Sequence, residues 1–250
     1  MVQVIRKIRS GNYEHIVIDL PKGISQDSLI EILSSRLFLS KEKVSAALTE
    51  LLQNGNQNQE DLMPILSMCF ADRYFLPWAI DSSGLLDFFR RNYNSVWDEH
   101  RKAMSKKLGL KCNEAMALAS IVEAEVVFPD EMQRVAGVYL NRLRKNWKLN
   151  ADPSIRFILR NKKVKRILHK DLGLINPYNT YQFYGLPPGG IGLISVDALD
   201  AVLNFEQHDF MFFCAKPDLS FRHVFTQTYA EHLRVARKYQ NALNERNIKR

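Results

Sequence analysis

Cysteine is scarce in this chain, and its placement argues against two kinds of site. The 250 residues contain three cysteines, Cys69, Cys112 and Cys214, and none of them belongs to a Cys-x-x-Cys pair. Zinc sites usually need such pairs, and a disulfide framework needs an even set of cysteines at regular spacings. We therefore expect all three to be small buried hydrophobic residues, and the sequence predicts no metal site and no cofactor.

Long apolar runs and phosphate-binding loops are missing as well. No stretch approaches the roughly 18 apolar residues of a spanning helix, and no basic-then-apolar leader opens the sequence, so the chain as given is expected to be soluble. The GxxxxGKS/T and GxGxxG patterns are absent, which leaves nucleotide binding unsupported. RNA-binding, zinc-finger and helix-turn-helix signatures are absent too, so we predict no nucleic-acid partner.

The composition that remains is that of an ordinary folded protein. Hydrophobic residues make up 46% of the chain and charged residues 25%, and the length allows one large core or two modest ones. The formal net charge of +8 indicates a polyanion in the surroundings. Nucleic acid, an anionic membrane surface and an acidic wall polymer all satisfy that condition.

The first 57 residues indicate a strand followed by two helices. Ile16 and Ile18 alternate with Val17 and Asp19 before a turn at residues 21–23, which predicts an extended segment. Apolar periodicity predicts helices over residues 25–36 and 41–52. The polar stretch over residues 54–59 is predicted to be a surface loop, and we place a soft domain boundary near it.

Helical spacing dominates the middle of the chain. One helical segment is predicted over residues 85–107, with Gly109 suited to the position after its end. Asn113 is expected to cap the next helix, which runs through MALASIVEAEVV to Pro129. A further helix follows and continues to Leu143.

Loops and a short sheet are expected in the last hundred residues. Prolines and glycines are dense from Ala151 to Gly192, which implies long ordered loops of the kind that carry sites. Residues 209–216 are predicted to form a buried strand, residues 223–226 its partner, and residues 228–246 a charged helix.

Two glutamates interrupt an otherwise apolar helical segment. Glu123 and Glu125 both have apolar neighbours three and four positions away, so either carboxyl is expected to be partly desolvated. Desolvation raises a carboxyl pKa, as a general acid acting near neutral pH requires. Periodicity alone does not say which glutamate is the acid, and most helical glutamates are exposed and inert.

Six motifs in this order resemble the MltG/YceG-like family of endolytic murein transglycosylases: LASIVEAE, VAGVYLNRL, ADPS, YNTY, GLPPGG and a late His-Val-Phe. The resemblance covers most of residues 60–245. It implies an α+β fold, with a partial LysM-like βαα subdomain over residues 1–57. A mainly helical catalytic domain with a short antiparallel sheet would span residues 58–250.

The same resemblance implies the catalytic residue. The glutamate of the family falls on Glu123, and Glu125 takes the second acidic position as a substrate-binding residue. Ala124 and Val126 stand where the family usually has Lys and Thr. These two departures remove polar groups near the acid.

Further substrate-binding residues are carried over from the other motifs. Arg142, which directly follows Asn141 in the VAGVYLNRL motif, could pair with a carboxylate. Three of the candidates have plainer alternatives. Asp152 could cap a helix, Asn179 could stabilise a turn, and His223 could be structural. The residues predicted to bind substrate, besides Glu125, are Asn141, Asp152, Tyr178, Asn179, Thr180, Tyr181, Pro187, Pro188 and His223.

The resemblance also implies a reaction and a location. One glutamate would protonate the β-1,4 glycosidic oxygen after N-acetylmuramic acid and then act as base on the C6 hydroxyl, giving a 1,6-anhydromuramoyl end. Full-length family members are membrane-anchored on the outer, periplasmic face of the cytoplasmic membrane, work with wall-synthesis enzymes and limit strand length; the anchor is missing here. A water-using muramidase and a non-catalytic peptidoglycan binder are the alternatives.

Overall fold

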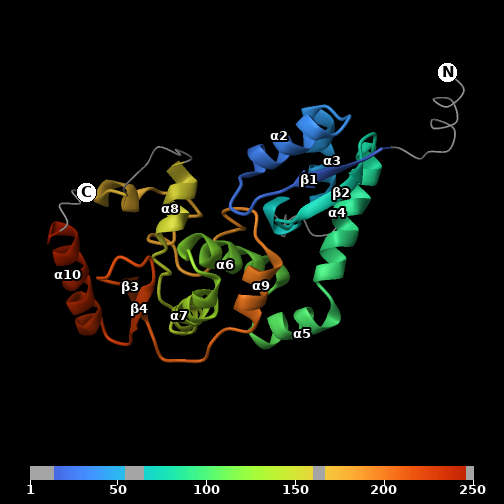
Figure 1. The fold of residues 1–250 in the computed structure, drawn as a ribbon. Helices are drawn as coiled ribbons and strands as arrows, with labels where there is room; N and C mark the ends of the chain where they lie inside the picture. Colours follow the sequence, from blue (N-terminus) through green and yellow to red (C-terminus); the bar gives the residue numbers. More distant parts are fainter. Residues whose placement is uncertain (1–13, 54–64, 160–166, 246–250) are drawn as a thin grey trace, which may run out of the picture. The chain divides into compact units, whose positions relative to one another are not determined.

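A computed structural model describes residues 14–53, 65–159 and 167–245, and these form two compact units (Figure 1). The first unit comprises residues 1–100 together with residues 192–195, and the second comprises residues 101–191 and 196–250. The loop predicted over residues 54–59, and with it the boundary placed after residue 57, lie outside the described residues. The observed elements are mostly helical with two short antiparallel sheets, so the α+β class is confirmed.

The first unit is built on a two-stranded sheet. Strand β1 (His15–Asp19) pairs antiparallel with β2 (Arg73–Pro77), and Val17 lies opposite Phe75. Ile18, Tyr74 and Leu76 point into the core, whereas Val17 and Phe75 are exposed. The strand predicted around Ile16 and Ile18 is confirmed, but β2 was missed because its outward residue is another large hydrophobic.

Among the described residues of this unit, three helices and two short segments accompany the sheet. Helices α2 (Gln26–Arg36) and α3 (Lys41–Gln53) confirm the two predicted helices, and Ser25 caps α2 by accepting a hydrogen bond from the Ser28 N–H. The distant segment 192–195 joins through a bridge between Phe70 and Ile194. The remaining elements are the short 3-10 helix η2 (Ile65–Ser67) and helix α4 (Ser82–Val96).

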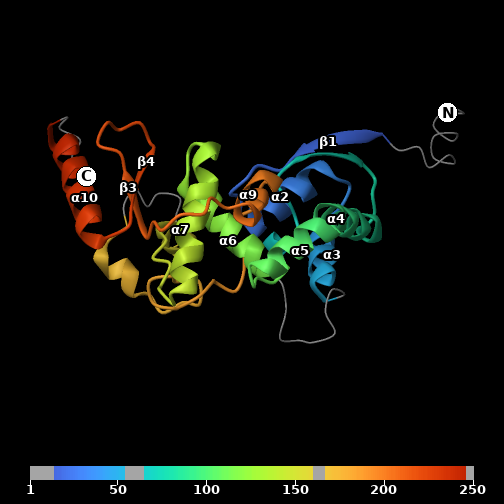
Figure 2. The same cartoon turned by 90° about the horizontal axis from the view of Figure 1, so that it is seen from below.

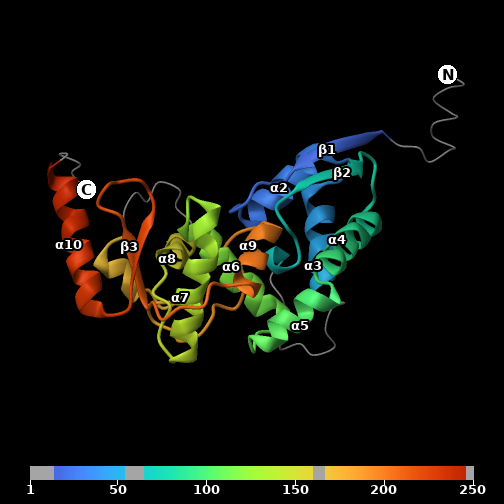
Figure 3. The ribbon, with the colours of Figure 1, turned by 60° about the horizontal axis from the view of Figure 1, so that its bottom comes forward.

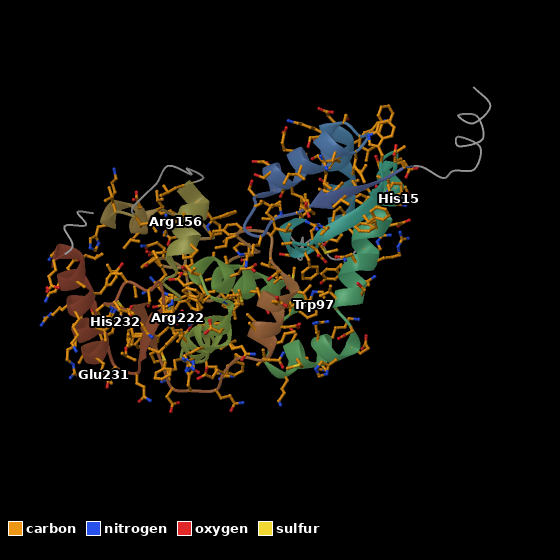
Figure 4. The ribbon with its side chains drawn as sticks, in the orientation of Figure 1. His15, Trp97, Arg156, Arg222, Glu231 and His232 are labelled. Carbon is orange, nitrogen blue, oxygen red and sulfur yellow. The ribbon has the colours of Figure 1, made fainter. Side chains whose placement is uncertain are left out.

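The single helical segment predicted over residues 85–107 is wrong. The chain leaves the helix at Trp97, whose backbone angles are φ −81° and ψ 63°, and a separate helix α5 (Glu99–Lys107) follows. The Trp97 side chain, labelled in Figure 4, is only 1% exposed. Burying so large a ring outweighs the few hydrogen bonds that a continuous helix would add. Gly109 has φ +74°, as expected for the residue after a helix end.

Helix α6 (Cys112–Glu125) runs through the middle of the second unit (Figure 2). Its residues from 115 to 122 are all buried, and it packs against α7 (Met132–Arg144), α8 (Asp152–Leu159) and α9 (Val196–Leu203). A strand pair, β3 (Phe212–Ala215) and β4 (His223–Thr226), packs on the terminal helix α10 (Tyr229–Glu245), as Figure 3 shows. Short helices η3 (Pro129–Glu131) and η4 (His169–Gly173) lie between these elements.

The predicted ends of α6 need correction at both sides. The cap is Lys111 rather than Asn113, and the Glu114 carboxylate accepts a hydrogen bond from the Lys111 N–H at 2.7 Å. The helix stops at Glu125 instead of continuing to Pro129, since Val126 already has extended angles, φ −103° and ψ 145°. Pro129 restricts only Phe128, the residue directly before it. Both strands and the terminal helix near the C-terminus are confirmed, although β3 is half-buried along its length.

Gly137 allows the segment between α9 and β3 to pack closely against α7. A Cβ atom at this position would lie 2.5 Å from the Glu206 carbonyl oxygen and 2.6 Å from Nε2 of His208. The backbone at Glu206 would have to shift to admit a methyl group. Gly137→Ala is therefore expected to lower the free energy of unfolding, measured by urea denaturation, by about 1 to 3 kcal/mol. Gly173→Ala is the control, since nothing lies within 4 Å of the added methyl group. Equal stability of the two variants would contradict the close packing.

Candidate active site

The two glutamates of interest occupy the last turn of α6 but face different surroundings. Residues two positions apart on a helix point in different directions, so the two carboxyls meet different neighbours. Glu123 is half-buried and makes interactions of its own. Glu125 is the last helical residue, and its Oε2 atom is buried with no hydrogen-bond partner among the residues the structure describes. Both residues are half-buried overall, and the buried, unpartnered Oε2 atom is what distinguishes Glu125.

The electrostatic surroundings of Glu125 favour its neutral form. Burial, and then the negative charge of Asp152, raise the pKa of Glu125 to about 7, while Arg142 and Arg156 act in the opposite direction. A buried carboxylate without hydrogen-bond donors is costly, so the group retains its proton. At neutral pH both the acid and the base form of Glu125 are populated.

Asp152 supplies the second carboxyl of this cluster. It is the first residue of α8 rather than a loop residue, and it is exposed. The Tyr181 hydroxyl donates a hydrogen bond of 2.6 Å to Asp152 Oδ1. Burial and this hydrogen bond raise the pKa of Tyr181, so its phenol stays protonated and remains a donor. Tyr181 thereby fixes a negative charge close to Glu125.

Arg142 is the positive group of the cluster. Its Nε donates to the Met211 carbonyl at 2.9 Å, and its Nη1 donates to the Leu149 carbonyl. Its guanidinium carbon lies 5.8 Å from the ring centroid of Tyr139 on the same helix. Because two N–H groups are committed to backbone carbonyls, Arg142 is a fixed charge whose field partly offsets the burial of Glu125.

Tyr139 and Arg156 also belong to this cluster, although neither was predicted from the sequence. Tyr139 is 1% exposed, and burial together with the charge of Glu125 raises its pKa well above the usual value. Tyr139 and Arg142 are three residues apart on α7, so they share one helix face. That spacing is visible in the sequence, but an aromatic at such a position is ordinarily a core residue.

The side chains of Asn179 and Thr180 form hydrogen bonds with nearby backbone groups. The Asn179 Nδ2 group donates to the carbonyls of Leu172 and Leu174 at 3.1 and 2.6 Å. Thr180 Oγ1 accepts from the Ala151 N–H at 2.9 Å. Their exposed fractions are 0% and 2%, so these side chains support the loop that carries Tyr181. Direct contact with substrate stays a prediction for both.

Three other predicted residues contact the scaffold. Asn141 Nδ2 donates to the carbonyl of His208 at 2.7 Å, and the Tyr178 ring packs on Phe157 with centroids 4.7 Å apart. His223 Nδ1 lies 3.0 Å from Oε2 of Glu131, a carboxylate at the start of α7 that is only 5% exposed. The structure therefore ties His223 to Glu131, and its predicted substrate contact remains untested.

Pro187 and Pro188 lie at a separate hollow. A cavity of about 480 Å³ is bounded by both prolines, by the beginning of α6 and by the end of α7. Glu114, which lines it, is about three helical turns from Glu125, roughly 16 Å along the axis. Residues 185–188 of the motif therefore lie near the beginning of α6. The segment that follows lies farther along this helix, since the Ile191 N–H donates a hydrogen bond to Ser120 Oγ at 2.9 Å.

Residues 14–53, 65–159 and 167–245 offer neither a group of metal ligands nor a membrane-spanning helix. In that part of the chain, no group of three His, Cys, Asp or Glu side chains is placed to hold a metal ion. No helix there is long and apolar enough to span a bilayer. The groups available for chemistry at the cluster are carboxyl, phenol and guanidinium groups.

A buried carboxyl with a pKa near 7, beside a second carboxylate and a fixed cation, is the arrangement of a general acid–base site. The family model described as the YceG-like family matches residues 1–238 of this chain, and the chain belongs to that family.

Individual relatives agree with the family assignment. An endolytic murein transglycosylase of Bacillus subtilis (strain 168) is 26% identical over 260 residues, covering 97% of this chain and 71% of that protein. One of Streptococcus pneumoniae is 30% identical over 135 residues, covering 48% of this chain and 24% of its own length. A crystal structure of a YceG-like protein from Listeria monocytogenes shares the fold. Its TM-score is 0.72 and its sequence identity 22%, and the match covers 93% of this chain and 80% of that one.

Proposed function

We propose that this chain is a lytic transglycosylase of peptidoglycan in which Glu125 is the catalytic acid and base. The observation that carries the proposal is the buried, unpartnered Oε2 of Glu125, whose pKa of about 7 suits a group that must both give and take a proton. Relatives named endolytic murein transglycosylases support the substrate.

The reaction we propose needs one carboxyl. Glu125 protonates the β-1,4 glycosidic oxygen between N-acetylmuramic acid and N-acetylglucosamine, and the bond from C1 to that oxygen breaks. The C6 hydroxyl oxygen then bonds to C1 while its proton passes to the Glu125 carboxylate, which closes the 1,6-anhydro ring. The fixed charge of Arg142 favours the carboxylate formed after the first step.

Glu125 takes the role that the motif resemblance assigned to Glu123. The resemblance reads the first glutamate of SIVEAE as the acid, whereas the buried carboxyl oxygen without a hydrogen-bond partner belongs to the second. Glu123 is half-buried at the surface of the same turn. We therefore propose Glu125 as the acid and keep Glu123 as the alternative.

Several finer features of this function are part of the proposal. The cleavage would be internal to strands and would limit their elongation, in contact with wall-synthesis enzymes at the outer face of the cytoplasmic membrane. The order β1, α2, α3, β2 supports a LysM-like role for the first unit. The positive net charge suits an anionic wall polymer.

Asp152 distinguishes this mechanism from a muramidase that delivers water. A hydrolase requires a second carboxylate as base or nucleophile, and Asp152→Asn would abolish its activity. In the mechanism proposed here, the substituted amide still accepts the Tyr181 hydrogen bond, but the negative charge that raises the pKa of Glu125 is lost. The variant is expected to remain active, with the alkaline limb of its pH–rate profile moved to lower pH. Asp197→Asn, which changes an exposed acid in α9, is the control.

The products test the function itself. Purified glycan strands incubated with the protein are analysed by mass spectrometry for 1,6-anhydro ends. Anhydro ends support the lytic transglycosylase, and hydrated reducing ends would point to the muramidase. Intact strands that nevertheless co-sediment with the protein would point to a non-catalytic binder, which the loss of polar residues at Ala124 and Val126 favours.

A further inference from the structure

Four aromatic side chains in the second unit form a cluster that includes exposed rings. Phe212 on β3 is at its centre, and its ring centroid lies 5.4 Å from His232, 5.8 Å from Tyr229 and 5.8 Å from Trp147. His232 stacks on Phe212 at an interplanar angle of 27°. Figure 4 shows His232 between α10 and the β3–β4 pair. We call these four residues the aromatic platform.

Two rings of the platform are largely exposed to water, although each contacts another ring of the platform. Tyr229 is 61% exposed and Trp147 is 46% exposed. The rings come from three separate segments, namely the loop after α7, β3 and α10, and they contact one another without any ligand. Rigid exposed aromatics of this kind are typical of recognition surfaces, because little side-chain entropy is lost on binding.

Arg142 connects the platform to Glu125. Its guanidinium carbon lies 5.8 Å from the Phe212 ring centroid, and its charge acts on both His232 and Glu125. One side chain therefore adjoins the acid on one side and the platform on the other. A polymer bound across Glu125 that continues in this direction reaches the exposed rings within a short length of chain.

We propose that the aromatic platform is a second sugar-binding subsite, which stacks a hexosamine ring of the same glycan strand beyond the sugars that flank Glu125. The C–H faces of such a sugar are apolar and its hydroxyl groups project from the edge, so a flat aromatic surface fits the ring face. The proposal rests on the function proposed above, because it takes the glycan strand as the ligand. It explains why Trp147 and Tyr229 remain exposed beside the site.

Binding to uncross-linked glycan strands tests the subsite without cleavage. Calorimetry in the Glu125→Gln background compares strands of several disaccharide units with a single disaccharide. Trp147→Ala and Tyr229→Ala are each expected to weaken binding of the long strands about tenfold and to leave the disaccharide unaffected. Trp147→Phe restores most of the affinity. Phe221→Ala, which removes a 71% exposed ring from the loop between β3 and β4, is the control and changes nothing.

The outcomes separate this inference from the proposed function. Long strands that bind the platform variants as tightly as the parent overturn the subsite even if wild-type protein makes anhydro ends. Wild-type protein that makes no product, with platform variants that lose affinity, overturns the lyase and leaves the subsite standing. A parent that does not bind long strands contradicts both. Circular dichroism checks that each variant is folded.

Discussion

Glu125→Gln is expected to lower the rate of strand cleavage by about 10³-fold, within the range that a general acid contributes. Glutamine keeps the shape of the side chain but cannot give or take the proton. The measurement is release of anhydro-ended fragments under conditions where strand binding is saturated. Affinity for strands should change little, because the loss lies in the chemical step.

Glu123→Gln is the matched control for this experiment. It makes the same chemical change two residues earlier on the same helix, and it is expected to keep most of the activity. The reverse pattern, with Glu123→Gln inactive and Glu125→Gln active, would return the catalytic role to the residue that the motif resemblance indicated. Loss of activity in both variants with normal folding would mean that the two carboxyls work together.

Glu125→Gln is also expected to stabilise the protein at alkaline pH. The Glu125 pKa is about 7 in the folded chain and near 4.5 when unfolded, so the folded state holds an extra proton between these values. Stability contributed by the protonated group is therefore complete below about pH 4.5 and is lost as pH rises to about 7. Above that pH, Glu125→Gln should be more stable than wild type, by on the order of 3 kcal/mol.

Urea denaturation at acidic and alkaline pH measures this difference, and Glu231→Gln provides a control of opposite sign. Hydrogen bonds from the backbone N–H and the side chain of Thr228 lower the pKa of Glu231, labelled in Figure 4. Its carboxylate therefore stabilises the fold above its unfolded pKa, and its replacement should destabilise the protein at alkaline pH. If Glu125→Gln is no more stable than wild type at alkaline pH, Glu125 is not buried.

The sequence predicted most elements of the fold where local patterns are strong. The helices after Ser25 and Lys41 and the strand pair near the C-terminus have clear periodicity and were placed correctly. The break at Trp97 was missed because tertiary burial of one ring decides it. Strand β2 was missed for a similar reason, since an exposed Phe75 hides the alternation that marks a half-buried strand.

The carboxyl cluster could be predicted only in part. The motifs place Glu125, Asp152 and Tyr181 among the important residues, but the sequence does not say that Tyr181 donates to Asp152 or that Asp152 begins a helix. Choosing between Glu123 and Glu125 depends on which direction the last turn of α6 faces. That direction follows from the packing of α6 against its neighbours, and a helical pattern with apolar residues on every side does not reveal it.

The central claim is that the pKa of Glu125 lies near 7, and an NMR titration of isotope-labelled glutamate side chains measures this pKa directly. The Glu125 carboxyl signal, assigned by its loss in Glu125→Gln, is predicted to titrate with a midpoint of about 7. A midpoint near 4.5, the ordinary value for a glutamate in water, would contradict the claim and remove the physical basis for Glu125 as the acid.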